Sequence, residues 1–274
     1  MGRFIRIPGR IRRAPERLRR VVRALVTDPF ETLLYAPEVV ARQFESTASY
    51  AVEEEWGPAL HSLLGLPWPC PELDALDTVW ADIRTRLHGQ GLAFGRYTYG
   101  GYSDADVGLG GAAWCAVRHL HPITVVETGV ARGATSRVIL EALSLNGAGH
   151  LWSIDLPHPF APELHGETAA AIPGRQHQRW TYVQGSSRRR LPPLLAELGN
   201  IDLFVHDSLH TARNMSFEMH LAWPRLRAGG LMLVDDVYNQ SFRDFIKDAR
   251  PAAATVCRSA DGTWMFGITR KAST

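Results

Sequence analysis

Acidic side chains and one histidine follow two neighbouring β-branched runs in the second half of the chain. Asp207 follows the first run, with His210 three residues further on, and Asp235 and Asp236 follow the second. The carboxyl ends of adjacent parallel strands meet at one rim of a sheet, so we expect the three carboxylates to face one another. Carboxylates that close repel strongly unless a cation lies between them or some are protonated. An all-oxygen set favours a hard cation such as Mg²⁺, Ca²⁺ or Mn²⁺ over zinc.

A glycine-containing turn earlier in the chain could hold a nucleoside. The segment ETGVARG, residues 127–133, follows a short apolar run and precedes a helical stretch. Gly129 and Gly133 allow a tight turn and a close approach of ligand to backbone, and the free N–H groups of the next helix face that ligand. The segment lacks the glycine that the G-x-G-x-x-G fingerprint places beside a pyrophosphate. A ligand with a nucleoside and an amino-acid tail but no diphosphate fits better.

Two further strand ends contribute candidate contacts. Asp155 ends the next β-branched run, where a carboxylate can accept hydrogen bonds from two ribose hydroxyls. Gly185 and Ser186 follow the third run and would lie beside an adenine. The arginines at 188–190 are interpreted as a solvated helix face, and a clamp for an anionic substrate is the less favoured alternative.

Repeated alternation of strand and helix signals predicts the fold class. The strand runs lie at 123–128, 151–156, 180–185, 201–207 and 230–237, and the helical stretches at 134–147, 162–171, 187–198, 212–227 and 240–248. Such alternation predicts right-handed crossovers and a Rossmann-like parallel α/β sheet with helices on both faces. Two closing strands, 252–258 and 263–269, flank Ala260-Asp261-Gly262 and predict an antiparallel C-terminal hairpin at one edge.

The order and spacing of these motifs, over about residues 105–270, resemble those of class I methyltransferases that use S-adenosylmethionine (SAM). The resemblance implies that Gly129 and Gly133 lie near the methionine moiety, that Asp155 holds the ribose, and that Gly185 and Ser186 border the adenine. The full set of cofactor contacts implied is Glu127, Thr128, Gly129, Gly133, Thr135, Ser136, Asp155, Gly185, Ser186 and Asp207.

The acidic residues and the histidine are similar to those of the cation-dependent O-methyltransferases of the catechol and caffeoyl-CoA type. The resemblance implies that Asp207, Asp235 and Asp236 bind the metal and that His210 is the base. The family often has Lys at the base position and Asn as the second residue of the pair. A cation would lower the pKa of the acceptor hydroxyl, His210, with an ordinary pKa of about 6.5, would take its proton, and the oxygen would attack the methyl group of SAM in line.

Three regions are expected along the chain: a basic amphipathic arm at 1–27, a helical cap or substrate region at 28–104, and the cofactor-binding domain at 105–274. Nine of the first 23 residues are arginines, opposed by one glutamate. The arm is interpreted as a helix docked on its own domain or on a twin subunit in a homodimer. A peripheral contact with an anionic membrane surface is the alternative, and nucleic acid is not expected because no aromatic stacking set accompanies the charge.

Composition and cysteine usage set the remaining bounds. The chain has 274 residues, a net charge of +2 and 45% hydrophobic residues, which is typical of a soluble globular protein. Its three cysteines are far apart and form no CxxC pair, so neither disulfides nor a zinc–thiolate site is predicted. With no convincing signal peptide and no apolar run of about 18–20 residues, a cytoplasmic location is expected.

The sequence therefore predicts a SAM-dependent O-methyltransferase acting on a small-molecule or glycan hydroxyl, with Mg²⁺ or another divalent cation. Three alternatives stay open at this point: a metal-independent methyltransferase, an NAD(P)-dependent oxidoreductase, and a non-catalytic scaffold that still binds SAM.

Overall fold

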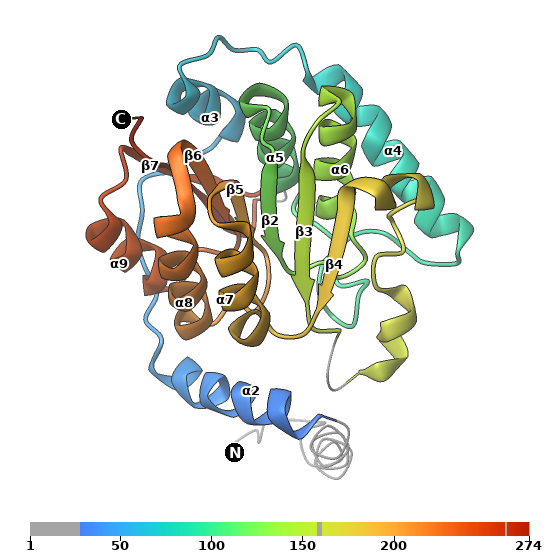
Figure 1. The fold of residues 1–274 in the computed structure, drawn as a ribbon, viewed down its shortest axis with the longest axis vertical. Coiled ribbons are helices and arrows are strands. Elements are labelled where there is room, and N and C mark those ends of the chain that lie inside the picture. Colours follow the sequence, from blue (N-terminus) through green and yellow to red (C-terminus); the bar gives the residue numbers. More distant parts are fainter. Residues whose placement is uncertain (1–27, 158–160, 261, 274) are drawn as a thin grey trace, which may run out of the picture.

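A computed structural model describes residues 28–157, 161–260 and 262–273. The predicted basic arm, together with Asp261 of the predicted hairpin turn, lies outside the described residues. One eight-stranded sheet runs through the molecule in the order β1-β7-β8-β6-β5-β2-β3-β4 (Figure 1). Its strands are β1 (Val52–Glu53), β2 (Thr124–Thr128), β3 (His150–Asp155), β4 (Trp180–Gln184), β5 (Ile201–His206), β6 (Leu226–Val234), β7 (Ala253–Arg258) and β8 (Met265–Arg270).

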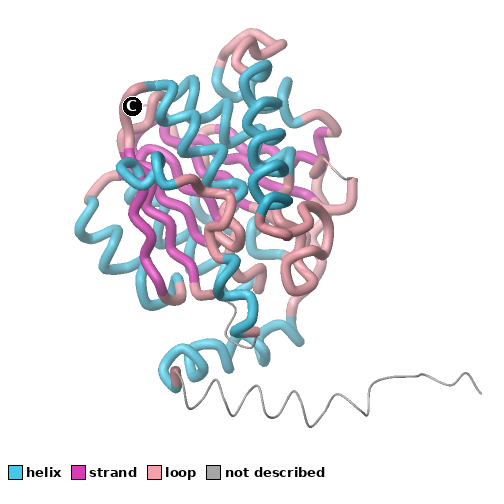
Figure 2. The backbone as a smooth tube through the Cα atoms, turned by 90° about the vertical axis from the view of Figure 1, so that its right-hand side faces the viewer, coloured by secondary structure: helices cyan, strands magenta, loops and turns pink. Residues whose placement is uncertain are grey.

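Helices cover both faces of the sheet, as predicted (Figure 2). Successive strand residues point to opposite faces, so Val125 and Leu203 enter one hydrophobic cluster while Val126 and Phe204 enter the other. The first cluster packs under α3 (Trp56–Leu64), α4 (Leu73–Gly89), α5 (Val107–Leu120) and α6 (Ala134–Asn146), and the second under α7 (Ser187–Leu198), α8 (Ala212–Ala222) and α9 (Gln240–Ala249).

The closing hairpin is confirmed, with one addition at its edge. Strand β8 pairs antiparallel with both β6 and β7. Outside β7 lies β1, a two-residue strand that pairs parallel with it and falls in a region interpreted from the sequence as helical. The sheet edge is therefore formed by a segment about 200 residues earlier in the chain than its partner.

Two helical predictions differ from the structure. The stretch 162–171 forms a short 3₁₀ helix (Pro162–Glu167) followed by turns, not an α-helix. Gly166 inside this stretch is a poor helix former and disfavours a regular α-helix there. The helix predicted over 212–227 ends at Ala222, because Pro224 follows and Leu226 already pairs with Ile201 as part of β6.

The predicted helical N-terminal extension divides into two parts. Helices α3 and α4 share one hydrophobic core with α5 and α6. Helix α2 (Pro29–Ala41) lies instead below the carboxyl ends of the central strands, as Figure 1 shows. Helix α2 thus lies over the edge where a ligand would bind. In the described part of the chain, no helix combines the length and the apolar character needed to span a membrane.

Candidate functional site

The strand order reverses between β2 and β5, which lie side by side while their crossover helices cover opposite faces. Ligands of doubly wound sheets bind at such a point, outside the carboxyl ends of the strands. The Asp207 N–H donates to the Thr128 carbonyl at 2.8 Å, so the ends of β2 and β5 are held together. Gly129 has φ +88°, and a Cβ there would overlap the Asp207 carbonyl oxygen. Only glycine allows this approach.

Three of the predicted site residues converge at this rim. One donor atom from each of Asp207, His210 and Asp235 lies within 4.8 Å of the other two. His210 Nε2 is 3.7 Å from Asp207 Oδ1 and 3.9 Å from Asp235 Oδ2. Asp235 is nearly buried, and the Asp235 N–H donates to the His206 carbonyl at 2.9 Å, which continues the pairing of β5 with β6 by one residue.

Asp236 lies on the other side of the imidazole. Its Oδ2 is 2.9 Å from His210 Nδ1, and it does not belong to the three-residue group. Asp236 has φ +51°, a left-handed conformation that few residue types tolerate. This backbone turn sends the carboxylates of Asp235 and Asp236 to different nitrogens of His210.

Burial and mutual repulsion control the protonation of this group. Burial and then the Asp207 and Asp236 charges raise the pKa of Asp235 well above its usual value. Burial lowers the pKa of His210, but the neighbouring carboxylates of Asp207, Asp236 and Asp235 outweigh that effect and raise it well above 6.5. Without a bound cation, the surrounding carboxylates therefore favour the protonated imidazole, whose positive charge offsets theirs.

The ribose candidate Asp155 stands at the end of β3, one strand from the glycine turn. Its Oδ2 accepts a hydrogen bond from the Ala131 N–H at 3.3 Å, within that turn. Burial raises its pKa to about 6, although backbone N–H groups oppose the rise. A cavity of about 380 Å³ opens beside it, lined by Pro157, Tyr182 and Gln184 among others.

Residues 126–237 match a family model described as a methyltransferase domain. The matched segment runs from β2 to just past β6 and covers less than half of the chain. An O-methyltransferase from Bacillus cereus, solved in complex with SAH (the product form of SAM), has a similar fold. The two proteins share 14% identity with a TM-score of 0.51, and the match covers 79% of this chain and 98% of that chain. The O-methyltransferase TomG from Streptomyces achromogenes, in complex with SAM, gives 16% identity, a TM-score of 0.51, and coverage of 79% and 97%. A comparison with curated proteins found no match.

The match to a methyltransferase-domain model and the Rossmann-like sheet agree with the resemblance that the sequence motifs predicted. Not every predicted cofactor contact faces the rim of that domain. Glu127 is completely buried and accepts hydrogen bonds from Ser136 at 2.6 Å and Ser153 at 2.7 Å. Thr128 donates its hydroxyl hydrogen to Glu218. Glu127 and Thr128 therefore stabilise the turn from inside the domain. The hydroxyl of Thr135 is buried and has no hydrogen-bond partner.

Gly185 and Ser186 lie where the resemblance placed the adenine, but a carboxylate of α2 approaches them. Glu31 Oε1 accepts the Ser186 N–H at 3.1 Å, and Glu31 is 3% exposed. A Cβ on Gly185, at φ +133°, would lie 2.8 Å from Arg190 Nε. Helix α2 therefore packs against the segment that follows β4, where the sequence predicted the adenine contacts.

The interpretation of 188–190 as a solvated helix face is wrong for two of its arginines. Arg188 donates from Nε to Glu38 at 2.8 Å, and Arg189 pairs with Glu31 at 3.2 Å. Both glutamates come from α2 and are buried. The sequence could not pair them because they lie about 150 residues before the arginines.

Asp106 is a site residue that the sequence analysis missed. It caps α5, where its Oδ1 accepts the Gly108 N–H at 2.8 Å. Its charge also acts on Asp235, and the charge of Asp207 acts on Asp106. Burial and, to a smaller extent, the Asp207 charge raise the pKa of Asp106 to about 6, although the backbone N–H groups of Ala260 and Gly108 oppose the rise. Asp106 is thus a fourth carboxylate whose charge acts on the acidic group. In the sequence, its only signal is its position just before a helix.

Arg132 was also missed, although it lies inside the glycine turn. Its guanidinium donates to Asp104 at 2.9 Å and to the carbonyls of Ala93 and Thr98 at 2.6 and 3.0 Å. Its side chain is 4% exposed. The glycine- and tyrosine-rich loop before α5 is therefore attached to the turn that borders the cofactor side of the methyltransferase domain.

The donor set fits a divalent cation. Asp235 Oδ1 and His210 Nε2 are buried with no hydrogen-bond partner, although buried polar atoms are normally paired. Both belong to the group whose donors lie within 4.8 Å of one another. Carboxylate oxygens suit Mg²⁺ or Mn²⁺, and the unpaired Nε2 beside them is free to accept a proton.

Proposed function

We propose that this methyltransferase domain transfers the methyl group of SAM to a hydroxyl of a small molecule or sugar, assisted by a divalent cation such as Mg²⁺. What carries the proposal is the convergence of Asp207, His210 and Asp235 beside the glycine turn. The solved structures of the same fold are named as O-methyltransferases, and TomG is described as taking part in tomaymycin synthesis. Those names are consistent with a hydroxyl acceptor.

Asp207 and Asp235 would hold the cation, with Asp106 adding negative charge behind them. When bound, the cation would lower the pKa of the acceptor hydroxyl and offset the carboxylate charge. Asp236 positions His210 by accepting its Nδ1–H, which fixes Nε2 toward the acidic group. With the carboxylate charge offset, His210 would lose the main cause of its raised pKa, and Nε2 could then accept a proton.

An acceptor cavity lies next to these groups. A cavity of about 290 Å³ is lined by Trp56, Trp80 and Gly108, together with Ala260. Asp106 joins this cavity to the acidic group, because its Oδ1 accepts the N–H groups of both Gly108 and Ala260. Two tryptophan faces suit a flat or sugar-like acceptor, which agrees with the predicted small-molecule or glycan class.

The first experiment is calorimetric titration of the purified full-length protein with SAH. Binding in the micromolar range would justify a screen of hydroxyl acceptors with and without Mg²⁺, in which activity should fall at least tenfold after chelation and return when Mg²⁺ is added. Absence of SAH binding by folded protein would contradict the proposed function. Binding without turnover on any acceptor would favour a non-catalytic SAM-binding protein.

A metal-independent methyltransferase is the second candidate, and one observation favours it. The raised pKa of His210 supplies a cation within the acidic group without any metal. Activity that survives chelation unchanged, but is lost in His210→Gln, would select this second function.

A further inference from the structure

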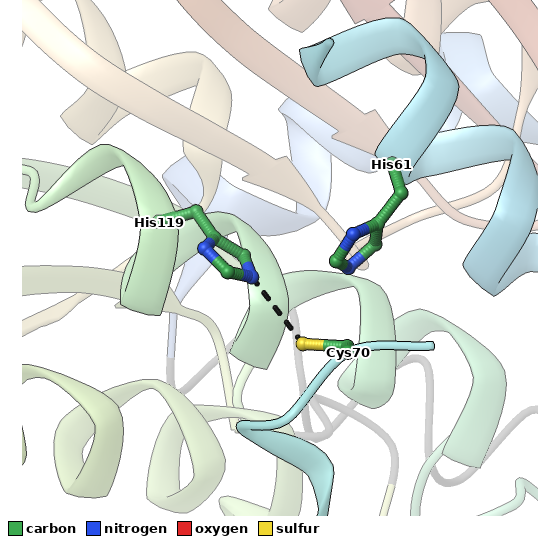
Figure 3. A group of neighbouring side chains, drawn as sticks. All are labelled: His61, Cys70 and His119. Carbon is green, nitrogen blue, oxygen red and sulfur yellow. Dashed lines mark hydrogen bonds between the residues drawn. The ribbon is translucent and has the colours of Figure 1, made fainter. Parts of the chain in front are cut away.

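Two histidines and two cysteines meet on the side of the molecule away from the acidic group. His61 lies on α3, Cys70 on the segment between α3 and α4, and Cys115 and His119 one turn apart on α5. Figure 3 shows the imidazoles of His61 and His119 on either side of the Cys70 sulfur. The sequence predicted no zinc–thiolate site because these residues are spread over 59 positions and form no CxxC pair.

The donor atoms are close enough to share one ion. Single donor atoms of His61, Cys70 and His119 all lie within 4.8 Å of one another. Cys70 Sγ is 3.3 Å from His119 Nε2 and 3.4 Å from Cys115 Sγ. Zinc bonds of about 2.0–2.3 Å in a tetrahedron separate nitrogen from sulfur by about 3.6 Å and two sulfurs by about 3.8 Å. The two measured separations are within about 0.4 Å of those values.

His61 is already oriented as metal-binding histidines are. Its Nδ1 donates to the Pro67 carbonyl at 2.6 Å, which leaves Nε2 as the unprotonated nitrogen of the neutral ring. Nε2 is buried with no partner, and His61 as a whole is 1% exposed. A backbone carbonyl that fixes the ring in this way is the usual second contact of a ligating histidine.

We propose that His61, Cys70 and His119 bind a structural zinc ion, with Cys115 as the fourth ligand. Cys115 lies outside the 4.8 Å group, so its side chain must turn toward the other three donors. Binding would form two zinc–sulfur and two zinc–nitrogen bonds, and each thiol would release its proton to solvent.

The protonation of the cluster agrees with this chemistry. Burial and the neighbouring His61 lower the pKa of His119, which favours the neutral imidazole that binds metals. Burial and then Cys70 raise the pKa of Cys115, so it stays a thiol until a cation offsets its charge. Among the groups around the cluster, only the Glu72 carboxylate raises the pKa of His119, while Arg118 and His121 lower it.

The position of the cluster indicates a structural role. His119 lies next to the end of α5, just before β2 begins, and is therefore at the amino edge of the sheet. Asp207 and Asp235 lie at the carboxyl edge. A zinc ion here would join α3, the start of α4 and α5, which cover one face of the sheet, without reaching the reacting groups.

The test is Co²⁺ and Zn²⁺ binding by the reduced full-length protein. We expect one ion per chain, a near-ultraviolet thiolate-to-cobalt charge-transfer band, and a rise in Tm of roughly 5–10 °C at a hundredfold excess of Zn²⁺ over its Kd. His61→Ala should weaken Zn²⁺ binding at least tenfold and Cys70→Ser should remove the band. Cys257→Ala, a buried cysteine outside the cluster, should keep both, and so should Asp235→Asn.

A measurement on the wild type alone guards against variants that fail to fold. Zn²⁺ binding to the reduced wild-type protein should release about two protons per ion, one from each ligating thiol, and Mg²⁺ should release none. Cobalt bound without a thiolate band, or Cys70 and Cys115 joined in a disulfide with no Zn²⁺ uptake by the reduced chain, would overturn the proposal. Because SAH binding plays no part in these readouts, they are independent of the proposed function.

Discussion

His206 on β5 donates a hydrogen bond from Nδ1 to Glu218 on α8 at 2.6 Å, and both side chains are fully buried. Glu218 also accepts hydrogen bonds from Ser208 at 2.7 Å and Asn214 at 2.8 Å, and from Thr128 at the end of β2. One carboxylate therefore ties the ends of two strands to the helix beneath the acidic group. Asp207 and His210 are placed by this network.

Glu218→Gln should destabilise the protein, because it leaves several donors with a weaker acceptor. Removing one partner of a buried charged pair typically costs about 3–5 kcal/mol, and we expect a loss near the lower end because the amide keeps one oxygen. Urea unfolding at neutral pH measures it. Glu197→Gln, an exposed change on α7, is the control and should alter the unfolding free energy by less than about 0.5 kcal/mol.

Glu218 should also control how the stability of the protein falls at acid pH. Burial opposes the charge of Glu218, but His206 and the hydrogen bonds outweigh it and lower its pKa from 4.5 to about 2. A lowered folded pKa contributes stability that is present above pH 4.5 and is lost as pH falls toward 2. The loss of stability over that window should be smaller in Glu218→Gln, and equal losses in both proteins would contradict the assignment.

Glu127 should show the opposite pH dependence. Burial raises its pKa to about 8, although the Ser136 and Ser153 hydroxyls oppose the rise. A raised folded pKa means that stability is full below pH 4.5 and falls as pH rises toward 8, with a slope of at most about 1.4 kcal/mol per pH unit. Glu127→Gln, which is neutral throughout, should flatten that decline in unfolding free energy. An unchanged slope would show that another group titrates.

Gly129→Ala should abolish SAH binding, because the added Cβ would overlap the Asp207 carbonyl and separate β2 from β5. Gly147→Ala is the matched control: Gly147 also has positive φ, at +71°, but nothing lies within 4 Å of its would-be Cβ. It should cost about 1–2 kcal/mol of strain alone. Calorimetry with SAH should separate the two, and similar SAH affinity in both variants would contradict the close approach.

Asp236→Asn should lower the pKa of His210, because it removes the acceptor charge 2.9 Å from Nδ1. Imidazole resonances followed by NMR against pH in metal-free protein measure this without any acceptor. Once an acceptor is known, kcat should fall by about 10²-fold or more while the SAH Kd stays within twofold. A kcat loss with no change in the His210 titration would assign Asp236 a different role.

Glu38→Gln should release α2 from the domain. The Glu38 carboxylate accepts from Arg188 at 2.8 Å, Arg213 at 2.6 Å and Thr211 at 2.5 Å, and it is 2% exposed. Backbone amides of residues 29–41 should then exchange hydrogen at least tenfold faster, while those of β2 and β5 stay protected. Val39→Ala, at a half-exposed position of α2, is the control. Unchanged exchange in Glu38→Gln would mean that hydrophobic contacts hold α2.

The parallel sheet could be predicted from the sequence because each strand and turn is indicated by residues close to it along the chain. Apolar runs such as 201–206 and the turn after Glu127 carry their own periodicity and glycines, and β-α alternation permits few topologies. The rim residues Asp207, His210 and Asp235 were found for the same reason, since strand ends in such a sheet must meet. By contrast, the two-residue β1 is too short for any periodic signal.

Only the tertiary structure decided which distant side chains meet. Asp106 joins the acidic group from a helix cap, Glu31 and Glu38 pair with arginines about 150 residues away, and Cys70 meets His119 of α5, 49 residues further on. Such contacts depend on packing between elements rather than on spacing within one. The raised pKa values of His210 and Asp235 likewise come from burial and neighbouring charges that exist only once the chain has folded.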